Sequence, residues 1–134
     1  MNLHEFLDDN FGEDGDEVLL KRIKEGEDLE ATYGDPEETP LLVATRRRRL
    51  SAVEILLDHG SEIDARNKFG KTSYAHAARR LFTEIAECLI ERGADTNVTL
   101  ADQFAIAVVE GNLDEARAIL ALSLIHISEP TRPY

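Results

Sequence analysis

Residues 39–67 read TPLLVATRRRRLSAVEILLDHGSEIDARN, and they contain two short apolar segments separated by a run of four arginines. The first segment follows Thr39-Pro40, and the second ends at His59-Gly60. Threonine is a good helix N-cap, proline suits the first helical turn, and glycine is common just after a helix end. The stretch therefore predicts two short helices joined by a tight turn.

The same pattern returns 33 positions later along the chain. A fixed period of this length indicates units that bury their apolar sides only by stacking on their neighbours. The corresponding pairs are Thr39 and Thr72, Ala44 and Ala77, Arg46 and Arg79, Arg47 and Arg80, Glu54 and Glu87, Leu56 and Leu89, and Gly60 and Gly93.

The repeated segments TPLLVA (39–44) and TSYAHA (72–77) resemble the T-P-L-H-x-A signature of the ankyrin repeat family. The turns HGSEID (59–64) and RGADTN (92–97) are similar to the family's G-A-D-x-N. The resemblance implies an all-α fold, an ankyrin-repeat α-solenoid of antiparallel helix pairs with protruding turns. It also implies that Leu56 and Leu89 are buried between neighbouring repeats.

The chain departs from the family pattern at two positions of each repeat. Leu42 and Ala75 replace the histidine of the signature, and Arg48 and Leu81 replace the glycine between the two helices. Without that glycine, the second helix is expected to start a residue early or late.

The repeats suggest a division of the chain into three parts. Residues 1–15 form an acidic N-terminal segment in which the apolar residues have helical spacing. Residues 16–121 form the repeat domain: a half-repeat cap (16–33), two repeats (34–66 and 67–99) and a truncated repeat (100–121). This last repeat aligns at an offset of 30, with the missing residues placed between Thr99 and Phe104.

Residues 122–134 are expected to be a non-native tail. The segment LSLIHISEPTR (122–132) resembles the translation of a sequencing adapter, which would place the end of the natural sequence near Ala121. The alternative is a C-terminal strand or helix end.

Composition narrows the possible functions. The formal net charge of −12 argues against a general nucleic-acid binder, because phosphate would be repelled. A single cysteine, Cys88, can form no internal disulfide, and neither a secretory signal nor a membrane-spanning run is visible. We therefore expect a cytoplasmic monomer that does not bind membranes.

No residue pattern points to catalysis or to a metal. The acidic N-terminal loop lacks the ligand spacing of a calcium loop, and the four histidines are scattered. Cys88 occupies a core-like position on the second apolar stripe of its repeat, and neither a phosphate loop nor a dinucleotide motif is present. We predict a protein that is not an enzyme and needs no cofactor or metal.

The cations of the repeats are the candidate binding residues. In the ankyrin family, the two positions after the paired alanines and the protruding turns commonly contact partners. This resemblance implies a partner-binding role for Arg46, Arg47, Arg79 and Arg80, and for the turn residues Asp35, Pro36, Glu38, Lys68, Phe69 and Lys71. A cationic strip with one aromatic anchor suits a protein partner that has an acidic segment. The alternatives are a solvated helix end, where cations favour the dipole, and a nucleic-acid contact.

The predicted function is a non-catalytic protein–protein interaction module, an ankyrin adaptor or scaffold that binds its partner through the concave face and turns. The alternative is a targeting arm of a larger enzyme or effector whose catalytic domain is lost by truncation.

Overall fold

The computed structural model describes residues 2–34 and 37–128, with side chains as far as residue 121. The described residues form helices and turns, with one isolated antiparallel bridge between Tyr33 and Glu38. The helices are α1 (Leu3–Asp9), α2 (Gly15–Lys24), α3 (Pro40–Arg46), α4 (Leu50–Asp58), α5 (Ser73–Arg79), α6 (Thr83–Glu91), α7 (Leu100–Val109) and α8 (Leu113–Ser128). The predicted all-α fold is confirmed.

The first helix of every pair begins at a side-chain cap. The side-chain oxygen of the cap accepts a hydrogen bond from the backbone N–H three residues on, at 2.8 Å for Asn2, 3.4 Å for Thr39, 3.2 Å for Thr72 and 3.1 Å for Thr99. These bonds satisfy N–H groups that have no partner within the helix. The caps predicted at Thr39 and Thr72 are confirmed, and Pro40 lies in the first helical turn.

The tight turn inside each of the last three pairs is preserved although two of them lack glycine. Arg48 and Leu81 adopt left-handed φ values of 55° and 57°, and Gly111 occupies the same place with φ 76°. In each case the next residue donates its backbone N–H to the carbonyl of the buried alanine, as from Arg49 to Ala44 at 2.9 Å. This bond closes the helix end and holds the strained residue.

The expected shift of the second helix is therefore wrong. Helices α4, α6 and α8 begin at Leu50, Thr83 and Leu113, in each case two residues after the left-handed position. A helix that starts after Gly111 and one that starts after Arg48 have the same register, because the backbone conformation is kept at the expense of local strain.

A glycine with left-handed φ follows each of the second helices α2, α4 and α6. Gly60 follows α4 with φ 92°, and a Cβ added there would meet nothing within 4 Å. Replacing Gly60 with alanine should lower the free energy of unfolding by about 1 kcal/mol, because the left-handed backbone disfavours a side chain. Urea denaturation would measure the loss. Gly60→Asn should lose less, and equal losses for both variants would contradict a purely conformational origin.

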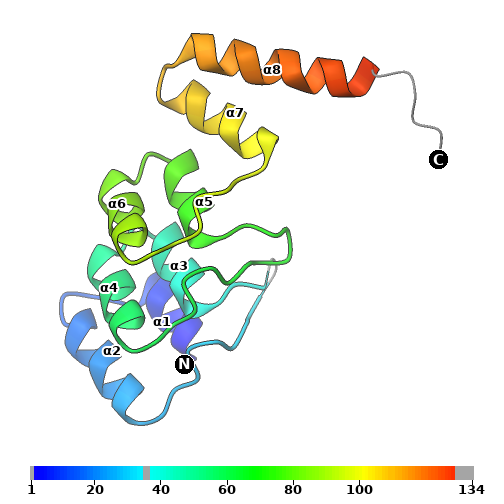
Figure 1. The fold of residues 1–134 in the computed structure, drawn as a ribbon. Coiled ribbons are helices and arrows are strands. Elements are labelled where there is room, and N and C mark those ends of the chain that lie inside the picture. The colour runs from blue at the N-terminus through cyan, green and yellow to red at the C-terminus, as the bar shows by residue number, and fades with distance from the viewer. Residues whose placement is uncertain (1, 35–36, 129–134) are drawn as a thin grey trace, which may run out of the picture.

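The helix pairs stack side by side, with α1 and α2 at one end and α7 and α8 at the other (Figure 1). The first helices form one layer, in which α3 packs against α1 and α5, and α5 packs against α7. The second helices form the other layer, in which α4 packs against α2 and α6. Leu56 and Leu89 are both fully buried in the core between the pairs, as predicted.

The N-terminal pair is more complete than the expected half-repeat. Helix α1 packs against α3 and places Leu3, Phe6 and Leu7 in the main core, with exposed fractions of 2%, 5% and 0%. These three residues form one face of the short helix and cover the apolar side of α3. Since α1 stands in the same relation to α3 as α3 does to α5, we propose that the repeat array begins with α1 rather than at residue 16.

The last pair differs from the others in its helix lengths and its core. Helix α7 has ten residues, whereas α3 and α5 have seven each. The expected location of the missing residues is wrong: residues 100–104 are helical, and the segment from Gly93 to the cap Thr99 is short instead. The small apolar cluster of Ala107, Ala116 and Ile119 is separate from the main core.

Helix α8 continues to Ser128, and so extends into the segment that was expected to be a non-native tail. Residues 129–134 and the side chains from 122 onward lie outside the described part of the chain. The assignment of 122–134 as a non-native tail stays a prediction.

Candidate functional site

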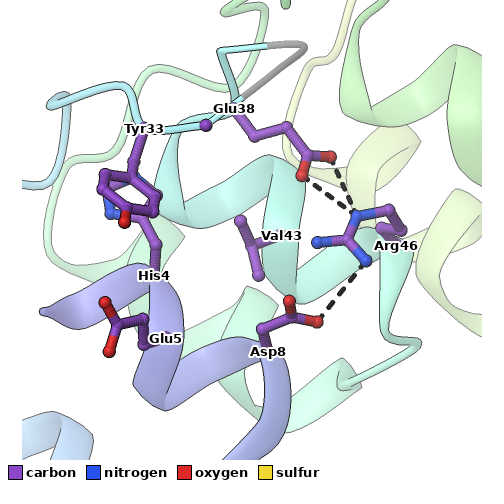
Figure 2. Close-up of a pocket in the computed structure, with 8 residues that line it drawn as sticks. His4, Glu5, Asp8, Tyr33, Glu38, Val43 and Arg46 are labelled. Carbon is purple, nitrogen blue, oxygen red and sulfur yellow. Dashed lines mark hydrogen bonds and ion pairs between the residues drawn. The ribbon is translucent and has the colours of Figure 1, made fainter. Parts of the chain in front are cut away.

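Three of the four arginines at 46–49 attach the turn between α3 and α4 to the N-terminal pair. Arg46 Nε lies 3.0 Å and 3.1 Å from the carboxylate oxygens of Glu38, and its Nη1 lies 3.4 Å from Asp8 Oδ1 (Figure 2). Glu38 is at the base of the first protruding turn, and Asp8 is in the last turn of α1. Arg46 therefore joins a turn, α3 and α1 through its own ion pairs.

Arg47 and Arg49 bind the C-terminal end of α1. Arg47 Nε donates to the carbonyl of Asp8 at 2.8 Å, and Arg49 donates to the carbonyls of Leu7 and Asp8 at 2.6 Å and 2.9 Å. The last carbonyls of a helix have no partner within it and carry its negative pole. Two of these cations thus serve a helix end, but it belongs to α1 and not to their own helix. Arg47 also pairs with the carboxylates of Asp8 and Asp9, at 3.2 Å and 3.5 Å.

Arg48 faces the following pair of helices. Its guanidinium lies 5.1 Å from the ring centre of Phe82 and 3.4 Å from Glu84 Oε1. Phe82 and Glu84 lie at the start of α6. The arginine run therefore bridges three successive pairs, which gives it a structural role in addition to any role in binding.

A second group of charges links the second protruding turn to α5 and α7. Lys71 Nζ lies 2.8 Å from Asp102 Oδ2, and Arg79 Nε lies 3.5 Å from Asp102 Oδ1. The Asp102 side chain is only 4% exposed, so this carboxylate depends on its two cations. Two of the predicted binding residues, Lys71 and Arg79, are thus brought together by a buried acid.

Sequence reasoning did not identify Asp102. The available signal was the sequence TLAD at 99–102, in which Thr99 corresponds to the caps Thr39 and Thr72. Asp102 lies three residues after its cap, as Leu42 and Ala75 lie three residues after theirs. An unexpected carboxylate at an apolar position could have indicated a charged partner on the preceding repeat.

The tip of the second turn presents the aromatic residue. Asn67 accepts hydrogen bonds from the backbone N–H groups of Phe69 and Lys71, at 2.9 Å and 3.1 Å, and Gly70 has φ 76°. These bonds hold the turn outward and leave the Phe69 side chain 68% exposed. Lys68 precedes Phe69 at the same tip. The corresponding Asp35 and Pro36 of the first turn lie outside the described residues.

A cavity of about 210 Å³ lies between α5 and α7, lined by His76, Arg79, Arg80, Ala105 and Val109. The side chain of Arg80 is exposed, and no hydrogen bond or ion pair engages it among residues 2–34 and 37–121. Burial, and then the charge of Arg80, lowers the pKa of His76. This cavity is basic and carries no carboxylate in its lining.

A cavity of about 200 Å³ lies between α1 and α3 and has the opposite character. Its lining contains three carboxylates: Asp8 and Glu38 contact Arg46, whereas Glu5 lies apart from Arg46, near His4 (Figure 2). Val43 lies in this lining at the position that corresponds to His76 one period later. The first cavity lies between Val43 and the preceding helix α1, whereas the second lies between His76 and the following helix α7, and the two differ in charge.

Among residues 2–34 and 37–121, the other reactive side chains are not grouped for a reaction. Cys88 is half-buried, and burial raises the pKa of its thiol although Arg92 opposes this effect, so the thiolate is disfavoured. Over the described part of the chain, no three His, Cys, Asp or Glu side chains are grouped to hold a metal ion. Within the same residues, no helix has the length and apolar character needed to cross a membrane.

Comparison with known proteins identifies the repeat. The family model described as "Ankyrin repeats (3 copies)" matches residues 12–99. Alpha-latroinsectotoxin-Lt1a of Latrodectus tredecimguttatus is 34% identical over 91 residues, which cover 67% of this chain and 6% of that protein. The B-cell lymphoma 3 protein homolog of Mus musculus is 27% identical over 82 residues, which cover 61% of this chain and 18% of that protein.

The chain therefore spans only a small part of the length of these relatives. The family match covers more than half of the chain, and the stacked helix pairs with capping threonines and protruding turns agree with it. An ankyrin repeat domain is typically a non-catalytic module for binding other proteins. This chain belongs to the ankyrin repeat family.

Proposed function

We propose that the protein is a non-catalytic adaptor or scaffold that binds an acidic segment of a protein partner through the second turn and the end of α5. The observation that carries the proposal is a local surplus of exposed cations in a chain of net charge −12. Such a surplus attracts an acidic partner and orients it. Arg46 and Arg47 stand at the edge of the proposed surface, where Glu38, Asp8 and Asp9 already neutralise much of their charge.

The ion pairs of Asp102 support a single continuous surface. They connect Lys71, at the base of the second turn, with Arg79, at the end of α5. The turn tip with Lys68 and Phe69 is then continuous with the helix end that carries Arg80. An exposed aromatic ring flanked by cations has the composition of an interface hot spot.

The partner is proposed to be a protein and not a nucleic acid. The chain as a whole repels phosphate, and its four-arginine run is engaged with α1, Glu38 and Glu84. We further propose that the protein acts as a cytoplasmic monomer, so that the surface of α5 and α7 is open to a partner.

Replacing Arg80 with glutamate is expected to weaken binding to the partner about tenfold, because a favourable charge contact becomes a repulsive one. Phe69→Ala should have a similar effect through loss of the apolar anchor. A partner would first be captured with the intact chain, and binding of the purified pair would then be measured by calorimetry at two salt concentrations.

Lys21→Glu is the matched control, since it makes the same charge change on an exposed residue of α2. The fold of all three variants should be unchanged by circular dichroism. We avoid Arg79→Glu because it would place a carboxylate beside the buried Asp102. If Arg80→Glu and Lys21→Glu weaken binding equally, the interface lies elsewhere.

The alternative, a targeting arm of a larger enzyme or effector, is favoured by the length of the relatives, since the matched residues make up only 6% and 18% of them. Sequencing the source DNA beyond the codon for Ala121 would test it. A downstream catalytic domain would support the targeting arm, and further repeats or a stop codon would support the adaptor.

A further inference from the structure

We propose that the cavity between α5 and α7 binds one carboxylate side chain of the partner, held by His76, Arg79 and Arg80. The inference rests on the proposed function, because the acidic segment of the same partner would supply the carboxylate. It adds a defined pocket and a pH dependence to a surface that was otherwise defined only by its charge.

The cavity has the shape and lining that one acidic side chain needs. Arg79, in the last turn of α5, and its C-cap Arg80 are three and four residues after His76, so the three side chains lie on the same side of the helix end. Ala105 and Val109 of α7 form the opposite, apolar wall. The volume of about 210 Å³ is below the range of about 300–1,000 Å³ that is typical of small-molecule sites. The apolar wall suits the methylene groups of an acidic side chain, and the cations suit its carboxylate.

The imidazole of His76 has an unused hydrogen-bonding atom. Its Nε2 is buried and has no hydrogen-bond partner among the described residues. Buried polar atoms in native proteins nearly always have a partner, so an exception calls for an explanation. A carboxylate in the adjoining cavity would accept a hydrogen bond from Nε2 and would satisfy this atom.

The preceding repeat shows how the equivalent arginines are used. Arg46, which corresponds to Arg79, is bound by Glu38 and Asp8, and Arg47, which corresponds to Arg80, is bound by Asp8 and Asp9. The chain therefore supplies carboxylates to both Arg46 and Arg47. One period later, among the residues that the structure describes, the equivalent arginines have a single ion pair, from Asp102 to Arg79 at 3.5 Å.

The position of Asp102 leaves Arg80 available. Lys71 is the nearer partner of this acid, at 2.8 Å against 3.5 Å for Arg79. The α7 residues that line the cavity, Ala105 and Val109, are uncharged. The partner would thus provide a carboxylate to Arg80, as Asp8 and Asp9 provide carboxylates to Arg47 within the chain.

The pocket should bind more tightly at lower pH. The charged groups that act on His76 are Arg79 and Arg80 of α5, Arg46 of α3 and Glu38 of the first turn. Burial and the neighbouring arginines lower the pKa of His76, so the ring is neutral near pH 7 in the free protein. A bound carboxylate favours the imidazolium form and raises that pKa. Affinity should therefore rise as the pH falls from about 7.5 to about 5.5, a range in which a partner glutamate remains ionised.

The test uses the full chain and two synthetic peptides, acetyl-Gly-Glu-Leu-Glu-Leu-Gly-amide and the same peptide with glutamine in place of glutamate. The imidazole resonances are followed by NMR at millimolar peptide, and His76→Val identifies the resonance of His76. Valine occupies the equivalent position 43 of the preceding repeat, so this variant should fold. Inorganic phosphate is the third probe.

We expect the glutamate peptide to shift the His76 resonance and raise its pKa, whereas the glutamine peptide and phosphate do neither. Arg80→Gln should weaken binding of the glutamate peptide at least about fivefold. Lys21→Gln removes the same charge from α2 and should leave this binding unchanged. His76→Val should abolish the increase in affinity at lower pH.

Equal responses to the glutamate and glutamine peptides would overturn the proposal, and so would a response to phosphate as strong as that to the glutamate peptide. If Arg80→Glu weakens binding to the captured partner while the glutamate peptide leaves the His76 resonance unchanged, the proposed pocket is refuted but the proposed function stands. If neither binding of the partner nor binding of the peptide depends on Arg80, the pocket and the proposed function are both refuted.

Discussion

Replacing Leu89 with alanine is expected to lower the free energy of unfolding by about 2–5 kcal/mol. Leu89 is fully buried in α6, in the main core that joins the pairs. Each pair buries its apolar side only against its neighbours, so a cavity at this position weakens the internal packing and the stacking together. In an array of this size, such a loss is a large fraction of the total stability.

Urea denaturation followed by circular dichroism would measure this effect. The matched control is Ile90→Ala, which truncates the adjacent residue of the same helix, where the side chain is 50% exposed. The free energy of unfolding should fall much less in this control than in the Leu89 variant. A comparable loss from both would contradict the placement of Leu89 in the shared core.

Replacing Lys71 with methionine should lower the free energy of unfolding by about 2 kcal/mol, because it leaves the buried carboxylate of Asp102 with only the longer contact to Arg79. The full penalty for breaking a buried pair is reduced here, since the Lys71 side chain is one-quarter exposed and water screens the pair. The effect should be concentrated in the last pair, because Asp102 lies in the first turn of α7.

A double variant provides the control for the Lys71 prediction. Adding Asp102→Leu to Lys71→Met removes the unpaired charge and introduces leucine, the residue found three positions after the cap Thr39 in the first repeat. The double variant should recover most of the lost stability in urea denaturation, as expected when both partners of a buried pair become apolar. No recovery would show that Lys71 stabilises the protein through something other than Asp102.

The repeat pattern was sufficient to predict most of the fold. The caps Thr39 and Thr72, the buried Leu56 and Leu89, and the all-α class all follow from local rules that repeat every 33 residues. The missing glycines at Arg48 and Leu81 misled the prediction of the turn. A side chain raises the energy of a left-handed conformation but does not forbid it, and the hydrogen bonds that close α3 and α5 outweigh the strain.

The candidate site was predicted only as a set of positions. The sequence identified Lys71, Arg79 and Arg80 as cations on one repeat, but it could not show that a buried Asp102 engages the first two and leaves the third. Nor could it show that Arg47 and Arg49 bind the carbonyls of α1, which lie about 40 positions earlier in the chain. Such pairings depend on which helices become neighbours.

The sequence alone determined the repeat, the capped starts of α3 and α5 and the buried leucines of the second helices, because these depend on short-range backbone preferences and on apolar spacing within one unit. Only the tertiary structure decided which charges are neutralised and which remain free. Charges interact through space across neighbouring repeats, and the stacking of α1 on α3 and of α5 on α7 sets those distances. The same stacking gave two cavities different chemistry: the chain's own carboxylates line the one between α1 and α3, and His76, Arg79 and Arg80 line the one between α5 and α7.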